Sequence, residues 1–276
     1  MSPGSVAAFE SWRGRGIDFA AIWLEDNGWS DLANPADLLR PWQGSGRQML
    51  INVPMFPKSG GDLYSCAAGS YNQSWRGLGQ VLSSMGFGNS VLRLGWEFNG
   101  SWYSWSAIGK ADAYAGCWRQ VVDSVRQSAP GVRWDWSFNR GKESGMADPR
   151  AAYPGDNYVD FVGISEYDHW PAATSQAIWD SKHMPVAEHG VQMAIDFARA
   201  HGKLVSIPEW GNRTVGGLPD YGGDNAQYVR FFHTMLMNNS GIIAYEAQFQ
   251  AEGGQYNNGA SLPNAAAAYK QLFGGG

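Results

Sequence analysis

Two glutamates, each directly after a short apolar run, are the residues of this chain best suited to chemistry. Glu97 follows residues 91–96, VLRLGW, and Glu209 follows residues 204–208, LVSIP. Hydrolysis of a glycosidic bond uses a pair of carboxyl groups that flank the bond. Parallel α/β barrels present their catalytic residues at the carboxyl ends of their strands. The two glutamates therefore indicate a glycosidase built on such a barrel.

Aromatic side chains accompany both glutamates in the sequence. Trp96, Trp102 and Trp105 flank the first, and Trp210 directly follows the second. Because sugar rings stack their apolar faces on flat aromatic rings, these residues are candidates to bind a polysaccharide or oligosaccharide. For either glutamate alone, the alternative is a solvated loop acid or the partner of an arginine. That alternative explains both of them together less well.

The composition predicts a single domain over residues 1–276. Hydrophobic residues make up 44% of the chain and charged residues 16%, which suffices for a large core. The net charge is −5 and the basic residues form no run, so we expect no nucleic-acid partner. No apolar stretch is long enough to span a membrane, so we expect no membrane partner. We expect the protein to act as a monomer.

The two cysteines, Cys66 and Cys117, leave two alternatives open. They lack the spacing of a zinc site, and the sequence fits one disulfide and two buried thiols equally well. The first five residues, MSPGS, contain no basic segment followed by an apolar one, which is the pattern of a secretion signal. Because such a signal is removed on export, we still expect a secreted, extracellular protein whose signal peptide is absent from this sequence.

Short β-type runs alternate with longer helical patterns along the chain, which is typical of βαβ units and a parallel sheet. The predicted strands cover residues 17–23, 48–53, 91–96, 132–138, 159–165, 204–207 and 242–245. The predicted helices cover residues 71–85, 111–128, 191–201, 225–237 and 265–272. The pattern predicts an α/β fold, a (β/α)8 TIM barrel whose first strand is short or truncated. A doubly wound open sheet is less favoured, because no GxGxxG or GKS/T turn follows a strand.

Side-chain alternation predicts where the first glutamate points. Continued through the run at residues 91–97, it places Arg93 and Glu97 on one face and Trp96 on the other. An arginine near two carboxyl groups can keep one of them ionised. We therefore expect Arg93 to line the barrel mouth below the glutamates. Trp96 is expected to point away from the axis, unless a bulge at the strand end turns it into the cleft.

Three segments together resemble glycoside hydrolase family 26, a clan A retaining family of β-mannanases with some β-glucanases and β-xylanases. Residues 93–105, RLGWEFNGSWYSW, resemble its acid/base motif. Residues 153–168, YPGDNYVDFVGISEYD, resemble the segment entering its sixth strand, and residues 206–211, SIPEWG, resemble its nucleophile strand. The first motif keeps the family's order of residues: Arg93, Glu97, Asn99, Gly100 and Trp102. The resemblance runs from about residue 17 to the C-terminus.

The resemblance implies a role for each of three residues. Glu97 would be the acid/base at the end of the fourth strand, Glu209 the nucleophile at the end of the seventh, and Tyr167 the hydroxyl beside the nucleophile. By the same count the first strand would lie in or before residues 1–10. The family usually has histidine where this chain has Trp96, and an indole donates one hydrogen bond but cannot accept one or titrate. This departure weakens the mannanase assignment more than the glycosidase assignment.

Other polar and aromatic residues at predicted strand ends are candidates for sugar contacts. The full set of predicted substrate-binding residues is Trp23, Arg93, Trp96, Asn99, Trp102, Trp105, Asn139, Tyr167, Trp170, Trp210 and Glu246. Arg140 and His169 follow strands in the same way, and for such residues the alternative is a loop cap or a surface position. The five histidines show no metal-ligand spacing. We expect neither a metal nor an organic cofactor.

These observations predict a retaining, endo-acting glycoside hydrolase that cleaves a β-linked polysaccharide by double displacement with two glutamates. A β-mannan-like substrate is favoured, and a β-glucanase or another cell-wall polysaccharide hydrolase is the alternative. From a different class, the alternative is a carbohydrate-binding pseudoenzyme, which would keep the aromatic cleft and lose one carboxylate. A serine hydrolase is disfavoured because no GxSxG elbow is present.

Overall fold

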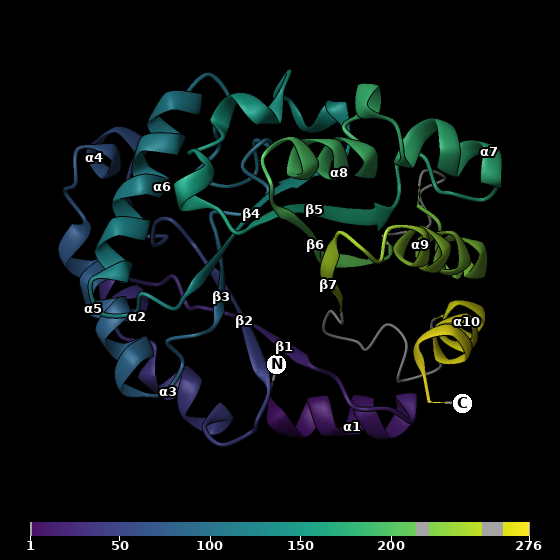
Figure 1. The fold of residues 1–276 in the computed structure, drawn as a ribbon, viewed down its shortest axis with the longest axis horizontal. Helices are drawn as coiled ribbons and strands as arrows, with labels where there is room; N and C mark the ends of the chain where they lie inside the picture. The colour runs from purple at the N-terminus through teal and green to yellow at the C-terminus, as the bar shows by residue number, and fades with distance from the viewer. Residues whose placement is uncertain (1, 214–220, 250–261, 276) are drawn as a thin grey trace. The chain divides into compact units, whose positions relative to one another are not determined.

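The structure is a computed structural model, which describes residues 2–213, 221–249 and 262–275. Within these residues it has seven strands, ordered in one sheet as they are in the sequence (Figure 1). They are β1 (Phe19–Trp23), β2 (Gln48–Val53), β3 (Val91–Leu94), β4 (Arg133–Asn139), β5 (Phe161–Asp168), β6 (Leu204–Asn212) and β7 (Ile243–Gln248). Neighbouring strands run parallel with helices between them. This is the topology of a (β/α)8 barrel, which confirms the predicted fold class.

All five predicted helices are present, with ends within two residues of the predicted ones. They are α5 (Asn72–Ser84), α6 (Ala111–Arg126), α8 (Val191–Ala200), α9 (Ala226–Asn238) and α10 (Pro263–Phe273). Five further helices were not predicted: α1 (Pro3–Arg13), α2 (Trp29–Ala33), α3 (Ala36–Leu39), α4 (Leu63–Ala67) and α7 (Gln176–Ile178). Four of these have only three to five residues, which leaves little or no periodicity to detect. No helix in the described part of the chain is long and apolar enough to cross a membrane.

The expectation that the first strand could lie within residues 1–10 is wrong for the described residues, because α1 occupies this segment. Phe9 and Trp12 of α1 pack against Tyr269 of α10, with ring centroids 5.8 and 6.1 Å apart. The Arg13 guanidinium donates a hydrogen bond to the carbonyl oxygen of Phe273 at 2.7 Å. These aromatic contacts with the C-terminal helix stabilise a helix where the strand count favoured a strand.

The chain forms two compact units, and β5 runs through the division between them. The first consists mainly of Asp18–Asn139 and Glu143–Val162, and the second mainly of Gly4–Ile17, Arg140–Lys142 and the chain from Gly163 onward. The single-domain organisation therefore stays a prediction.

A disulfide fastens two helices of the first unit. Cys66 of α4 and Cys117 of α6 are bonded, with Cα atoms 4.8 Å apart and a sequence separation of 51 residues. Closing a loop of this length restricts the unfolded chain and stabilises the fold by roughly 2–4 kcal/mol. Of the two alternatives left open by the sequence, the disulfide is correct.

Candidate active site

A buried polar layer lies under the carboxyl end of β3 in the first unit. The sheet register places Arg93 beside Asn52 of β2 and Asp135 of β4, and all three side chains are buried. Arg93 donates one hydrogen bond to Ser137 Oγ at 2.7 Å and another to Asn52 Oδ1 at 3.2 Å. These two bonds tie the guanidinium to both neighbouring strands. Its expected influence on the two glutamates stays a prediction.

The backbone that carries Glu97 is irregular. β3 ends at Leu94, and both Gly95 and Glu97 adopt left-handed backbone angles, with φ of 49° and 52°. A Cβ at Gly95 would lie only 2.8 Å from the Met55 side chain, so this position requires glycine. The Glu97 amide donates to the Ser137 carbonyl oxygen at 2.9 Å, which fixes the turn to β4.

Strand alternation therefore does not extend to Glu97, and the expectation based on it is wrong beyond Leu94. A left-handed glutamate costs about 1–3 kcal/mol and persists only where its surroundings hold it in place. Such residues cluster at active sites and ligand clamps. The strain at Glu97 thus supports a functional role more directly than its position after a strand does.

The Glu97 carboxylate accepts a hydrogen bond from an exposed indole. Trp102 Nε1 donates to Glu97 Oε2 at 3.0 Å, while Glu97 itself is only 8% exposed and Trp102 is 48% exposed. A Cβ at Gly100 would collide with the Trp102 ring, so the glycine allows the indole to lie against the backbone. This arrangement puts an accessible aromatic surface directly beside the carboxylate.

Trp96 and Trp105 belong to a buried aromatic cluster with Tyr103. Trp96 Nε1 donates to the Tyr103 hydroxyl at 2.9 Å, and Trp105 Nε1 donates to the Trp96 carbonyl oxygen at 2.8 Å. Tyr103 and Trp105 stack with ring centroids 4.5 Å apart. The indole N–H of Trp96 is therefore engaged within the cluster. Sugar contacts by Trp96 and Trp105 stay predictions.

Asn99 and Asn139 bind each other through their backbones and side chains. Asn99 Oδ1 accepts from the Asn139 amide at 2.7 Å, and Asn99 Nδ2 donates to the Asn139 carbonyl oxygen at 2.8 Å. Asn139 Nδ2 donates to Ser144 Oγ at 3.1 Å. The pair fastens the turn after β3 to the end of β4, which positions Glu97 from its C-terminal side. Their predicted sugar contacts are not tested by these bonds.

In the second unit, Glu209 lies within β6 and not at its exit, because β6 continues to Asn212. The register against β7 shifts between Ile207 and Trp210, which places Glu209 in a β-bulge. Bulges redirect side chains and are frequent beside active sites. The Tyr167 hydroxyl donates to Glu209 Oε1 at 2.5 Å. The structure thus brings these two predicted residues together.

The tyrosine that contacts Glu209 is itself held firmly. Tyr167 is 5% exposed, and the Arg213 guanidinium lies 5.0 Å from the centroid of its ring. Arg140 donates to the carbonyl oxygen of Tyr167 at 3.2 Å and also contacts that of His169. The backbone from Tyr167 to His169 is therefore tied to one guanidinium.

A buried ionic network continues from that guanidinium. Arg140 Nε lies 3.0 Å from Glu166 Oε2, and His183 Nδ1 lies 2.6 Å from Glu166 Oε1. The other ring nitrogen of His183 is 2.9 Å from the Pro171 carbonyl oxygen, so both ring nitrogens face oxygen atoms. All three side chains are buried. Glu166 was not predicted, and Arg140 was left as a possible surface residue. A lone acid directly after the apolar run FVGIS, residues 161–165, was the available signal.

Asp168 and His169 end β5 with opposite electrostatic behaviour. Burial raises the pKa of Asp168 to about 6, although its carboxylate accepts from the Ala173 amide at 2.7 Å and from Asn225 Nδ2 at 2.8 Å. Burial, together with the positive charges of Arg140 and Arg213, lowers the pKa of His169 to about 3. His169 is thus neutral over the ordinary range of pH.

The remaining predicted residues differ in exposure. Trp170 is 47% exposed, and its ring centroid lies 4.6 Å from that of His169, so it presents an open aromatic face. Trp210 is fully buried, stacks on Phe232 at 3.9 Å, and donates to Glu246 Oε2 at 2.5 Å. Burial raises the pKa of Glu246. Trp23, half-buried at the end of β1, is paired in register with Asn52. Sugar binding by these residues stays a prediction.

Residues 89–207 match the model of glycosyl hydrolase family 26, a segment that includes Glu97 and Tyr167 and ends two residues before Glu209. Endoglucanase H of Acetivibrio thermocellus is 26% identical over 186 residues, which are 65% of this chain and 19% of that protein. A mannan endo-1,4-β-mannosidase of Bifidobacterium adolescentis is 30% identical over 118 residues, which are 42% of this chain and 11% of that protein. The chain thus corresponds to less than a fifth of the length of either relative.

The catalytic domain of the endo-β-1,4-mannanase of Bacillus sp. JAMB-750 has a similar fold. Its structure superposes with a TM-score of 0.60 at 19% identity, over 87% of this chain and 70% of that one. The family match confirms the predicted resemblance to glycoside hydrolase family 26, and the superposition shows a shared fold.

Proposed function

We propose that this protein is a retaining glycoside hydrolase that cleaves internal bonds of a β-linked polysaccharide, with β-mannan favoured. Glu97 is the acid/base and Glu209 the nucleophile. The observation that carries the proposal is the left-handed Glu97 with its carboxylate bonded to an exposed indole, inside the segment that matches the family. A strained acid beside an open aromatic surface suits a site that binds sugar and transfers protons.

Each residue has a defined part in double displacement. Glu209 attacks the anomeric carbon and forms a covalent glycosyl ester, while Glu97 gives its proton to the departing glycosidic oxygen. Glu97 then takes a proton from the water that attacks the ester, and Glu209 is released as a carboxylate. The Tyr167 hydroxyl, 2.5 Å from Glu209 Oε1, keeps the nucleophile in one orientation.

Substrate and location follow from the same features. Trp102 and Trp170, each about half exposed, are the aromatic surfaces on which sugar rings stack. The Cys66–Cys117 disulfide favours an oxidising compartment, as does a polymer too large to enter a cell. A secreted monomer that acts on polysaccharide, with no nucleic-acid or membrane partner, fits a net charge of −5.

Removal of the nucleophile tests the proposal. Glu209→Ala should lower turnover of β-mannan at least ~1,000-fold, and added azide should restore part of it, because azide occupies the position of the missing carboxylate. The rescued product should be a glycosyl azide of inverted anomeric configuration. Reducing ends released from mannan, mixed-linkage glucan, xylan and a bacterial cell-wall glycan identify the substrate. Glu143→Ala, which removes an exposed glutamate, is the control. Full activity of Glu209→Ala would sink the assignment.

Removal of the acid tests the second role. Glu97→Ala should slow the cleavage of polysaccharide but spare the glycosylation step with activated aryl glycosides, since a good leaving group needs little protonation. Pre-steady-state release of the aryl group measures that step. Equal losses on aryl and natural substrates would mean that Glu97 is not the acid.

A further inference from the structure

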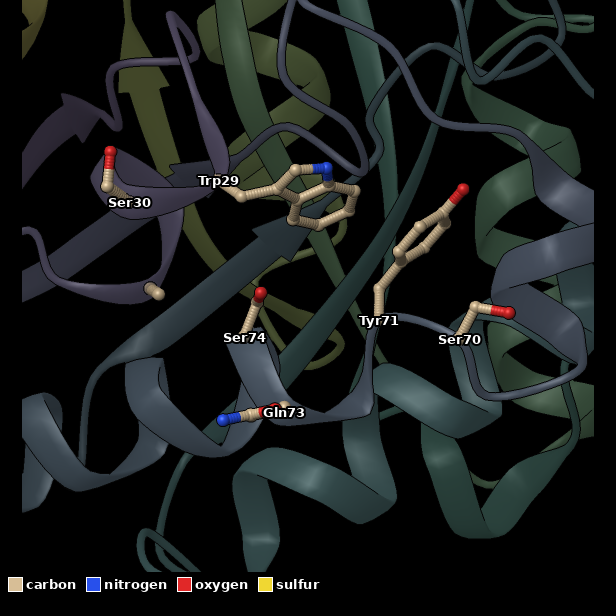
Figure 2. A pocket seen from close by; sticks show the side chains of 7 residues that line it. Trp29, Ser30, Ser70, Tyr71, Gln73 and Ser74 are labelled. Carbon is tan, nitrogen blue, oxygen red and sulfur yellow. The ribbon is translucent and has the colours of Figure 1, made fainter.

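A second concave site lies in the first unit, between α2 and the beginning of α5. It is a pocket of about 550 Å³, within the size range of small-molecule sites (Figure 2). Its lining consists of Trp29, Ser30, Ala33, Ser70, Tyr71, Gln73 and Ser74. None of these residues belongs to the predicted catalytic or substrate-binding set.

The lining has the chemistry of a neutral sugar site. Trp29 and Tyr71 lie with ring centroids 4.3 Å apart and planes inclined by 27°, and the edge of Trp29 rests on buried Trp75. Figure 2 shows hydroxyl and amide groups of Ser30, Ser70, Gln73 and Ser74 around the two rings. No lining side chain carries a charge at neutral pH, so an ionic ligand would find no counter-charge. Aromatic carbon next to neutral hydrogen-bonding groups matches the mixed apolar and hydroxyl surface of a pyranose.

The pocket also lies on the appropriate side of the sheet. Trp29 begins α2, which follows β1, and Tyr71 directly precedes α5, which follows β2. In a βα unit the helix begins on the side where the strand ends, and the active sites of such barrels lie on that side. An extended polymer at the active site can therefore also reach the N-terminal ends of α2 and α5.

We propose that Trp29 and Tyr71 form an additional binding site for a neutral polysaccharide segment. The proposal rests on the proposed function for its choice of polymer, and not for the existence of the site. The segment comes either from a distant part of the chain being cleaved or from a second polysaccharide molecule. In both cases the site retains polymer and makes no contact with the bond that breaks.

The test compares three variants in the Glu209→Ala background, which binds without turnover. Trp29→Ala removes a ring, Ser74→Arg fills the pocket and keeps both rings, and Tyr64→Ala is the matched control. Tyr64 is 64% exposed on neighbouring α4 and does not line the pocket. Affinity electrophoresis in β-mannan should show five- to tenfold weaker binding for the first two variants and unchanged binding for the control. Thermal melting verifies that each variant is folded.

Turnover in the otherwise intact enzyme completes the test. Trp29→Ala and Ser74→Arg should raise KM for polymer severalfold and leave kcat/KM for an aryl mannobioside within twofold. If the loss also appears with mannohexaose, the site holds the chain being cleaved; if only polymer is affected, it holds a second chain.

If both pocket variants are folded and bind polymer as well as the parent protein does, the proposed binding site is wrong. Inactivity of the unmodified protein on every glycan would overturn the proposed function alone, because electrophoresis would still report on the pocket.

Discussion

The two glutamates differ in how the chain holds them. Glu97 sits in a left-handed turn, in an aromatic region, and its hydrogen-bond donor Trp102 is 48% exposed. Glu209 sits in a bulge of β6, and its donor Tyr167 is 5% exposed and backed by a buried ionic network. Both backbones are irregular, but only the second donor is enclosed.

This difference matches the two chemical roles proposed for Glu97 and Glu209. An acid/base must exchange its proton and hydrogen-bond partners during each turnover, and an exposed indole can yield to an arriving sugar. A nucleophile must keep a single orientation toward one carbon, because small displacements cost large factors in rate. The network that holds Tyr167 consists of buried charges. The free-energy cost of removing these charges from water is offset only when every partner is present. The ionic network should therefore be the least tolerant part of the molecule.

The largest effect is expected from Glu166→Ala. This change leaves the Arg140 guanidinium and the His183 ring buried without their shared anion, which should lower the free energy of unfolding by about 3–5 kcal/mol. Urea denaturation measures the loss. Glu188→Ala is the matched control, because Glu188 pairs with the exposed lysines Lys142 and Lys182. Its removal should lower the free energy of unfolding by less than about 1 kcal/mol. If both variants lost the same free energy of unfolding, the buried network would be no more sensitive than a surface ion pair, which would contradict the comparison.

The next effect separates the two donors. Tyr167→Phe keeps the ring and removes only the hydroxyl that binds Glu209, so kcat should fall about 10- to 100-fold, or about 1.4–2.7 kcal/mol, with little change in KM. Trp102→Phe removes an exchangeable donor and part of a stacking surface, so KM should rise about three- to tenfold with a smaller change in kcat. Steady-state kinetics on mannohexaose would contradict the comparison if the two variants gave the same pattern.

Elements governed by local pattern could be predicted from the sequence. β2 was predicted with its observed bounds, Gln48–Val53, because five of its six residues are buried and the run has clear ends. The predicted end of β6 was five residues short, because Glu209 and Asn212 are polar and a polar residue normally signals a strand end. Their partners, Tyr167 and Gly223, are distant in sequence and cannot be paired with them from composition.

The same local signals selected the candidate site residues but not the residues that support them. Both glutamates and Tyr167 were chosen as candidates because each lies in a short motif. The left-handed turn at Glu97 was missed, because alternation assumes that the strand continues. Glu166 and His183 were missed as a pair, because they are 17 residues apart and meet only in the folded chain.

The smallest effect concerns pH. Asp168 has a folded pKa of about 6 against an ordinary value of 3.8, so its contribution to stability is full below about pH 4 and is lost as pH rises through 6. His169, with a folded pKa of about 3 against 6.5, contributes the opposite slope, because only the unfolded chain binds its proton between these values. In the natural sequence the two slopes partly cancel.

In Asp168→Asn, the dependence of stability on pH that comes from His169 should no longer be partly cancelled. Lost hydrogen bonds to Asn225 and Ala173 lower stability by an amount that does not depend on pH. Relative to the unmodified protein, however, the variant should gain about 1–2 kcal/mol between pH 4.5 and 6.5, because the destabilising ionisation of Asp168 is gone. Urea denaturation at half-unit intervals of pH measures the difference curve. Trp105→Phe, in the aromatic region, should change the free energy of unfolding by the same amount at every pH. A stability difference that depends on pH in Trp105→Phe, or one that does not depend on pH in Asp168→Asn, would show that the charged and aromatic regions do not differ in the way proposed.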